Sequence, residues 1–235
     1  MGADVPKVLL PLCGRPMLAY ILDALAEVGV SRLIVVVGKG GEQVKEAFGE
    51  GNEYVRQEEQ LGSGHAVLCA RESARGSTSS PQAGSSYVLV MCGDSPLFHT
   101  ETIRSLMNAH VREHAAVSLA SAILEDPRGY GRIIRGTDGE IAGIVEEKLA
   151  TDAQKTVKEI NGGCYAFDAE WLWANIEALT SNEAGEYCLT EMVDIALAQD
   201  RRVIAVSAAP DEVAGVNTPS QLEDAEKIIR SRGAC

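Results

Sequence analysis

The sequence predicts a mixed α/β fold built on a doubly wound, mostly parallel sheet. Residues 33–37 and 87–91 are apolar at every position, as expected for strands that are buried on both faces. Segments with a helical spacing of apolar residues alternate with these runs, which is typical of parallel sheets. Residues 132–135 and 141–145 form two further runs around Asp138-Gly139, a strong hairpin signal. We therefore expect an antiparallel piece inserted into the α/β pattern.

The other elements follow from apolar spacing and from residues that begin and end helices. Pro16 suits the first position of a helix that Gly29 can end. Further helices are expected at 42–48, 64–74, 100–113, 168–179, 190–198 and 219–229, and a further strand at 203–206. Residues 76–86, rich in Gly and Ser, are expected to form a flexible surface connection. The whole predicts one domain over residues 1–235, with a small antiparallel subdomain at approximately 125–190.

The composition excludes several classes of function. The chain has 34 acidic and 21 basic residues, and its formal net charge of −13 argues against nonspecific nucleic-acid binding and docking on anionic lipid. No apolar stretch approaches the length of a membrane span, and the first residues lack the pattern of a secretory signal. The six cysteines have no metal-ligand or redox spacing and are expected to be thiols rather than disulfides. These features predict a cytoplasmic protein and leave its oligomeric state open.

One carboxylate stands directly after a predicted buried strand. The apolar run from Tyr87 ends at Gly93, Asp94 follows at once, and Pro96 prevents the strand from continuing as a central one. Open α/β sheets bind their ligands at the carboxyl ends of their strands. Asp94 is therefore a candidate for binding a metal ion or for a place beside a phosphate.

Other motifs allow both a functional and a structural interpretation. Gly62-Ser63-Gly64 opens a helix whose free N–H groups suit an anion or a base edge, but an ordinary loop-to-helix turn has the same sequence. Gly38 to Gly41 follows a strand as a dinucleotide-binding loop does, yet position 43 is Gln43 and the third glycine is absent. His110 to His114 matches the H-x-x-E-H pattern of one zinc-protease class, although a solvated helix face explains it equally and no third ligand is evident. Lys7 is either a surface lysine or a functional one.

Eight segments, in order along nearly the whole chain, resemble the sugar-nucleotidyltransferase family. They are PKVLLPLCGRPM (6–17), RQEEQLGSGHA (56–66), CGDSPL (92–97), DPRGYGRI (126–133), GIVEEK (143–148), EINGG (159–163), EYCLTE (186–191) and GVN (215–217). They are most similar to the uridyltransferase domain of the bifunctional N-acetylglucosamine-1-phosphate uridyltransferases. The resemblance implies a Rossmann-like nucleotidyltransferase fold in which the hairpin subdomain binds the sugar.

The resemblance also implies a reaction. An oxygen of N-acetylglucosamine-1-phosphate attacks the α-phosphorus of UTP, and UDP-N-acetylglucosamine and pyrophosphate are formed for cell-wall precursor synthesis. No enzyme nucleophile is needed, so the protein must align two anions and neutralise charge. Mg²⁺ suits such a site because it takes few protein oxygens and keeps waters and phosphate oxygens.

Residue roles follow from the matching motifs. Asp94 and Asn217 would hold Mg²⁺, and Lys7 and Asp94 would be the catalytic residues, with Lys7 stabilising charge on the reacting phosphates. The nucleotide would be bound by Lys7, Gln57, Gly62, Ser63 and Gly93. The sugar phosphate would be bound by Gly131, Glu146, Asn161, Tyr187 and Thr190.

Three departures from the family pattern change these expectations. Met1 aligns with the last residue of a glycine-rich loop of the type LxxGxGTRM, so we expect the first strand and nearly all of this phosphate-binding loop to be missing. The neighbours of that strand should then carry unpaired N–H and C=O groups. Cys92 stands where relatives often carry Tyr, and nothing after the last helix resembles a hexapeptide β-helix, so we expect no acetyl transfer.

The departures leave alternative functions open. The chain could be a catalytically impaired UDP-sugar-binding module, because the loop for the triphosphate is missing. It could also be a nucleotidyltransferase for another NTP or another sugar phosphate.

Overall fold

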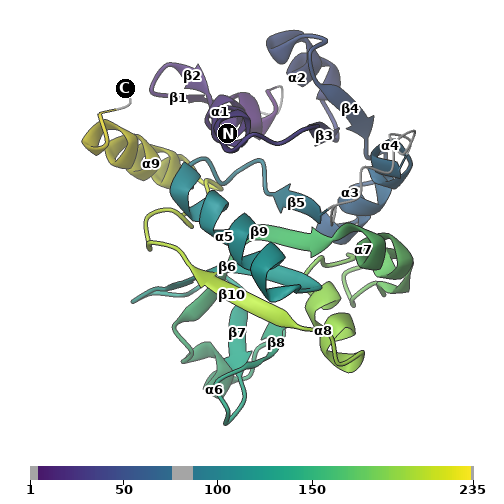
Figure 1. The fold of residues 1–235 in the computed structure, drawn as a ribbon. Coiled ribbons are helices and arrows are strands. Elements are labelled where there is room, and N and C mark those ends of the chain that lie inside the picture. The colour runs from purple at the N-terminus through teal and green to yellow at the C-terminus, as the bar shows by residue number, and fades with distance from the viewer. Residues whose placement is uncertain (1–4, 76–86, 234–235) are drawn as a thin grey trace.

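The computed structural model describes residues 5–75 and 87–233 and shows a mixed six-stranded sheet flanked by helices (Figure 1). The strand order is β10-β6-β9-β7-β8, and β5 pairs with β9. The strands are β5 (Tyr87–Met91), β6 (Val117–Ile123), β7 (Arg132–Arg135), β8 (Ile141–Val145), β9 (Glu159–Asp168) and β10 (Val203–Ser207). The predicted mixed α/β fold and its hairpin, now β7 and β8, are confirmed.

The expectation that strand pairs would be mostly parallel is wrong for the described residues. β9 runs antiparallel to β5, β6 and β7, whereas β6 and β10 are parallel. Since β9 lies between β5 and β6, it separates two strands that share a direction. β5, β6 and β10 therefore run in one direction and β9 runs in the opposite one. The sequence patterns predicted neither β6 nor β9 as a strand.

Helices cover both faces of this sheet. The α-helices are α1 (Met17–Val28), α2 (Gly41–Phe48), α3 (Ser63–Cys69), α4 (Arg71–Arg75), α5 (Thr100–Glu113), α6 (Asp152–Lys155), α7 (Ala169–Asn175), α8 (Glu191–Ala198) and α9 (Pro219–Ser231). Two 3₁₀ helices are η1 (Lys7–Leu9) and η2 (Ile176–Ala178). The predicted helix at 64–74 is two helices, α3 and α4, and Pro16 caps α1 rather than beginning it. The predicted connection at 76–86 lies outside the described residues.

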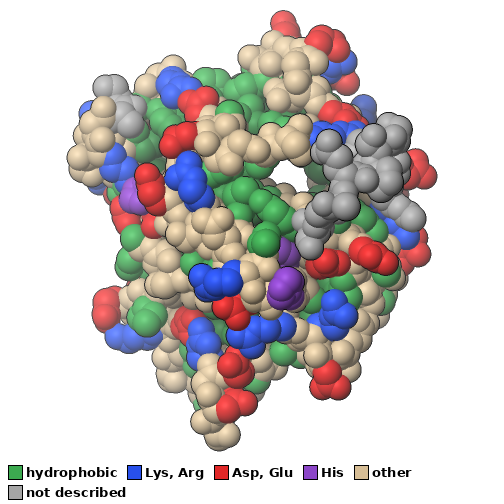
Figure 2. Space-filling view, in the orientation of Figure 1, with side chains coloured by type: hydrophobic (Ala, Val, Ile, Leu, Met, Phe, Trp, Pro, Cys, Tyr) green, Lys and Arg blue, Asp and Glu red, His purple; other side chains and the backbone are tan. Residues whose placement is uncertain are grey.

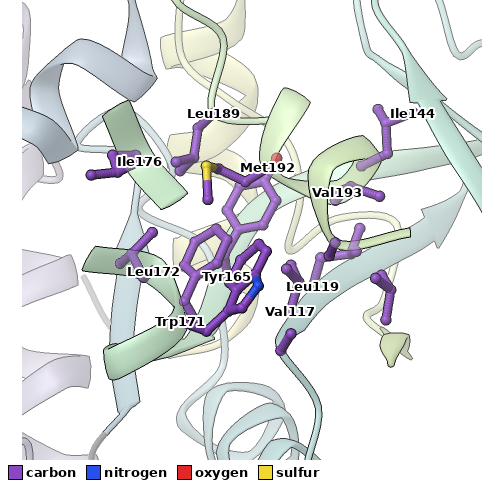
Figure 3. Close-up of a cluster of buried hydrophobic side chains, with 14 of the residues drawn as sticks. Val117, Leu119, Ile144, Tyr165, Trp171, Leu172, Ile176, Leu189, Met192 and Val193 are labelled. Carbon is purple, nitrogen blue, oxygen red and sulfur yellow. The ribbon is translucent and has the colours of Figure 1, made fainter. Parts of the chain in front are cut away.

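Alternating side chains of the central strands divide the core into two layers. Leu119 of β6 and Tyr165 and Phe167 of β9 pack with α7 and α8, whereas Ala120 and Ala166 face α5. Figure 3 shows Trp171 and Leu172 of α7 close to Tyr165 and Met192 in the first layer. Side chains on both faces of β6 and β9 are therefore buried, one face in each layer.

A gap separates this sheet from a second, smaller one. β3 (Ile34–Val37) pairs in parallel with β4 (Glu53–Arg56), and in the described residues β3 has no other strand partner and β5 has only β9. A cleft of about 1560 Å³ is lined by both β3 and β5 and by apolar residues of α1. Figure 2 shows the molecule hollowed between hydrophobic side chains in the region where Figure 1 places these strands. Every residue of β3 and β5 is only half-buried, as expected for strands that each lack a neighbour.

Two further predictions from the composition concern membrane-spanning segments and the state of the cysteines. None of the helices in residues 5–75 and 87–233 is both long and apolar enough to cross a bilayer. Cys69, Cys92, Cys164 and Cys188 are free thiols, as predicted. The expectation is wrong for Cys13, which is disulfide-bonded. A short two-stranded ribbon, β1 (Pro11–Leu12) with β2 (Arg15–Pro16), surrounds Cys13.

Candidate active site

Asp94 lies at the carboxyl end of β5, as predicted. The strand ends at Met91, and Ser95 N donates to Cys92 O at 3.2 Å, which turns the chain sharply. Val216 N donates to Asp94 O at 2.9 Å. This bond fixes the loop before α9 against the loop after β5, two segments that are far apart in the sequence.

The N-terminal cap of α9 holds Asn217 in place. Gln221 Oε1 accepts from Asn217 N at 2.8 Å and from Thr218 N at 2.9 Å, and Thr218 Oγ1 accepts from Gln221 N at 3.2 Å. Such a reciprocal capping box satisfies N–H groups that have no partner inside the helix. Asn217 therefore lies just before the capped helix, with its backbone fixed by Gln221. Its side chain is exposed on the same side as Asp94.

Lys7 brings Asp94 and Asn217 together. Its Nζ donates to Asp94 Oδ2 at 2.5 Å and to Asn217 Oδ1 at 2.8 Å. The backbone of η1 sets this position, because Pro6 lies against Gly40 and Val8 lies against Gly93. Two oxygens from different segments thus converge on one positive charge.

The same oxygens fit a hard cation. One carboxylate and one amide carbonyl are ligands that Mg²⁺ accepts, and Mg²⁺ commonly uses only one or two protein ligands. In the described part of the chain, no cluster of three or more His, Cys, Asp or Glu side chains could hold a metal ion. The ammonium group of Lys7 is a stand-in for such a cation, so the residues present fit Mg²⁺ rather than Zn²⁺.

Cys92 is next to this cluster but is not a nucleophile at neutral pH. A Cβ atom on Gly163 would lie 3.5 Å from its sulfur, which shows that the thiol points inward although the residue is exposed. Burial first, and then the negative charge of Asp94, raise the pKa of the thiol to about 11. The thiol therefore stays protonated, and it does not supply a thiolate to the site.

Four of the five predicted sugar-phosphate residues form one cluster on the large sheet, whereas Tyr187 contacts the loop at Gly62. Thr190 Oγ1 donates to Glu146 Oε1 at 2.8 Å, and Asn161 N donates to Gly131 O at 2.9 Å. A Cβ atom on Gly131 would lie 3.5 Å from Glu146 Oε2, so the glycine allows the carboxylate to approach the backbone. The three strands β7, β8 and β9 and the start of α8 therefore bring these four residues together.

Arg132 supports the same cluster, and sequence reasoning missed it. Its side chain is fully buried, and it forms an ion pair with Glu147 Oε2 at 2.6 Å and donates to Tyr130 O. Gly131 and Glu146 are the immediate neighbours of this pair. A buried arginine needs such partners to offset the loss of its hydration. The sequence hinted at a buried Arg132 only through its position between Gly131 and the apolar Ile133 and Ile134.

The loop predicted to bind the base is held by the segment after η2. Tyr187 N donates to Leu61 O at 2.7 Å, and Gly64 N donates to Tyr187 O at 2.8 Å. Ser63 Oγ accepts from Leu189 N at 3.0 Å, so this hydroxyl has a structural partner. The loop predicted to bind the base is thus joined by hydrogen bonds to the segment that ends in Thr190.

Replacing Gly62 with alanine is expected to weaken nucleotide binding about 10-fold or more. Gly62 has a φ of +100°, and a Cβ atom there would lie 2.6 Å from Tyr187 O, so the loop must move. Calorimetric titration with UTP measures the effect. Gly49→Ala is the matched control, because Gly49 has a φ of +72° and open space around it. Equal affinities for Gly62→Ala and the wild-type protein would contradict the role of this loop.

The cleft shows which predicted residues share a space. Lys7, Ser63, Gly93, Asp94, Glu146, Asn161 and Thr190 line the 1560 Å³ cleft. Gln57 instead lines a second cavity of about 440 Å³ over β3 and β4. The cleft thus brings together the predicted catalytic residues and three of the five predicted sugar-phosphate residues, whereas Gln57 lies on the smaller sheet.

The other motifs have structural explanations. His110 is buried and contacts Ser118 Oγ at 2.8 Å through Nδ1, while Glu113 pairs with Arg112 and Arg202. His114 caps α5 with a φ of +49°. These side chains therefore do not share a metal site.

Comparison with known proteins places the chain in a family. Residues 1–155 match the family model of the MobA-like NTP transferase domain. The bifunctional protein GlmU of Thermoanaerobacter pseudethanolicus is 42% identical over 233 residues, covering 99% of this chain and 49% of that protein. GlmU of Heliobacterium modesticaldum is 40% identical over 234 residues, covering 99% of this chain and 50% of that protein. The chain thus spans about half the length of the curated relatives it matches.

Solved structures share the fold. An apo UDP-glucose pyrophosphorylase superposes with a TM-score of 0.78 at 17% identity, covering 98% of this chain and 92% of that one. A Bacillus anthracis protein described as a glucose-1-phosphate thymidylyltransferase, in complex with sucrose, superposes with a TM-score of 0.74 at 18% identity, covering 97% and 87%. These likenesses agree with the mixed sheet and its flanking helices. The family model matches residues 1–155, and the GlmU sequences match 99% of the chain. The chain therefore belongs to the family of MobA-like NTP transferase domains.

Proposed function

We propose that the protein transfers a uridylyl group from UTP to N-acetylglucosamine-1-phosphate, with Mg²⁺ as cofactor. One observation carries the proposal: Lys7 and Asp94 line the same cleft as Glu146, Asn161 and Thr190, and Lys7 also donates to Asn217. A cation site beside a polar cluster is what the joining of two anionic substrates needs. The resemblance of the sequence motifs supplies the identity of the substrates.

The reaction requires alignment and charge neutralisation. A phosphate oxygen of the sugar phosphate attacks the α-phosphorus of UTP, the bond between the α-phosphorus and its bridging oxygen breaks, and pyrophosphate leaves with that electron pair. Lys7 would stabilise the charge that develops on the phosphate oxygens. Asp94 and Asn217 would hold Mg²⁺, which, when bound, neutralises phosphate charge. Because Cys92 stays protonated, we assign no covalent intermediate to it.

The two sheets would bind the two substrates. Residues at approximately 125–190 would form the sugar-binding lobe of the 1–235 domain, since Asn161 lies in β9 and Gly131 and Glu146 lie directly beside the ends of β7 and β8. Gln57 and the loop at Gly62 would bind uracil from the side of the smaller sheet. The backbone N–H groups of Gly62 and Ser63 would donate to the base edge, since Gly62 O already accepts from Gln57 Nε2 and Ala66 N.

A second candidate is a catalytically impaired binding module. The gap between β3 and β5 favours it, because in the described residues these two strand edges face an open cleft without a strand between them. Such a module would keep the uridine and sugar contacts but not the reaction.

Two measurements on the same protein separate these functions. Pyrophosphate release is assayed with Mg²⁺ and a panel of nucleoside triphosphates and sugar phosphates, and UDP-N-acetylglucosamine binding is measured by calorimetry. Turnover that is highest with UTP and N-acetylglucosamine-1-phosphate is the expected result. Binding without turnover would support the module, a different best pair would change the substrates, and neither binding nor turnover would refute both functions.

A further inference from the structure

The side-chain amide of Gln57 has a single orientation. Nε2 donates to Gly62 O at 3.0 Å and lies 3.0 Å from His65 Nδ1. A carbonyl oxygen can only accept, so the amide atom beside Gly62 O must be the nitrogen. The second amide hydrogen then faces His65, whose Nδ1 must be the unprotonated, accepting nitrogen.

This arrangement leaves only an acceptor for a ligand. Both amide hydrogens of Gln57 are used inside the protein, and among residues 5–75 and 87–233 no group donates to Oε1. Gln57 is 9% exposed and lines the 440 Å³ cavity. Any ligand that meets this amide is therefore offered a carbonyl oxygen and no donor.

An acceptor discriminates between pyrimidines. Uracil and thymine carry an N–H at ring position 3, which donates, whereas the same nitrogen of cytosine accepts. Pairing two acceptors leaves both without a hydrogen, which costs more than losing one bond. We propose that His65 is a positioning residue that fixes the Gln57 amide, so that the site selects imide bases over cytosine. This inference rests on the proposed nucleotide site.

His65 is well placed for such a role. It lies in the first turn of α3, three residues after Gly62, and its ring is tilted by 34° to that of Tyr187 with 6.3 Å between ring centroids. Cys69, one turn later, brings its sulfur to 3.8 Å from Nε2. These neighbours restrain the ring, so that a phenylalanine would keep the packing and lose only the acceptor.

Calorimetry with UTP and CTP tests the proposal without requiring turnover. In His65→Phe the ratio of the Kd for CTP to the Kd for UTP is expected to fall about 3- to 10-fold, the effect of one neutral hydrogen bond. In His65→Asn, whose side-chain oxygen can replace Nδ1 as acceptor, the ratio should return toward the wild-type value. Cys69→Ala is the control, because it disturbs the packing of His65 without removing the acceptor, and its ratio should not change.

The outcomes are distinguishable. Equal weakening of UTP and CTP in His65→Phe, or an unchanged ratio, would overturn the positioning role and leave the proposed function standing. A wild-type protein that binds no uridine nucleotide would refute the proposed function and this inference with it. NMR of the ¹⁵N-labelled wild-type protein gives a second test if His65→Phe does not fold: a proton on Nε2 is expected, and a proton on Nδ1 would overturn the proposal.

Discussion

Replacing Asp94 with alanine is expected to lower kcat by about 10³-fold, with little change in Tm. Among the described residues, the carboxylate is the only charged oxygen that Lys7 contacts, and removing one preorganised electrostatic partner costs about 10²–10³ in rate. Folding should survive because the side chain is 27% exposed and the backbone bond from Val216 N remains. The measurement is pyrophosphate release at saturating UTP and Mg²⁺, with thermal unfolding in parallel.

A surface pair of the same chemistry provides the control. Asp224 receives a hydrogen bond from Lys227 at 2.7 Å on α9, and 62% of its side chain is exposed. Asp224→Ala should leave kcat unchanged. Activity in Asp94→Ala at the level of this control would rule out Asp94 as the essential carboxylate.

Replacing Lys7 with methionine is expected to lower kcat by about 10²-fold, since one charge-stabilising donor is lost. The same change should lower the Mg²⁺ concentration that gives half-maximal rate. The reason is that the ammonium group occupies the two oxygens, of Asp94 and Asn217, that Mg²⁺ would use. Rates measured across a Mg²⁺ titration give both quantities.

Lys227→Met is the matched control for this change, and it should alter neither kcat nor the Mg²⁺ dependence. An unchanged kcat in Lys7→Met would remove Lys7 from the catalytic site. A lowered kcat with the Mg²⁺ dependence unchanged would keep its catalytic role but contradict the competition for the two oxygens.

Local signals predicted many elements well. α5 begins and ends where apolar spacing placed it, at residues 100 and 113, and Gly29 ends α1 in the left-handed conformation. The Asp138-Gly139 hairpin also formed as predicted, with Gly139 at a φ of +83°. Each of these depends on neighbours within a few residues, which is the information that a sequence pattern holds.

The central strand β9 escaped prediction because its glycines normally interrupt strands. Gly163 has a φ of +77°, and a Cβ atom on Gly162 would lie 3.0 Å from Ala120 O of β6. The strand tolerates both glycines because β5 and β6 bond to it on either side. Only the pairing with β5 and β6 explains why this segment is extended. The same pairing is antiparallel, whereas mostly parallel pairs were expected.

In the site, too, local patterns predicted some features, whereas others depend on contacts between distant segments. Asp94 could be found from its place after an apolar run, but its partners Lys7 and Asn217 came from the family resemblance. They stand 210 positions apart in the chain, and no local pattern relates them. The role of His65 could not be found in the sequence, because it depends on which atom of the Gln57 amide faces Gly62.

The gap between β3 and β5 gives the two sheets unequal resistance to local unfolding. The residues proposed to bind the sugar phosphate lie on or beside a sheet with helices on both faces, whereas Gln57 follows a two-stranded sheet that has no backbone bond to β5 in the described residues. Small units of this kind open with less free energy than the whole domain needs. A uridine nucleotide that bridges the gap would bind only the closed form, so part of its binding free energy would be spent in holding the smaller sheet folded against the larger one.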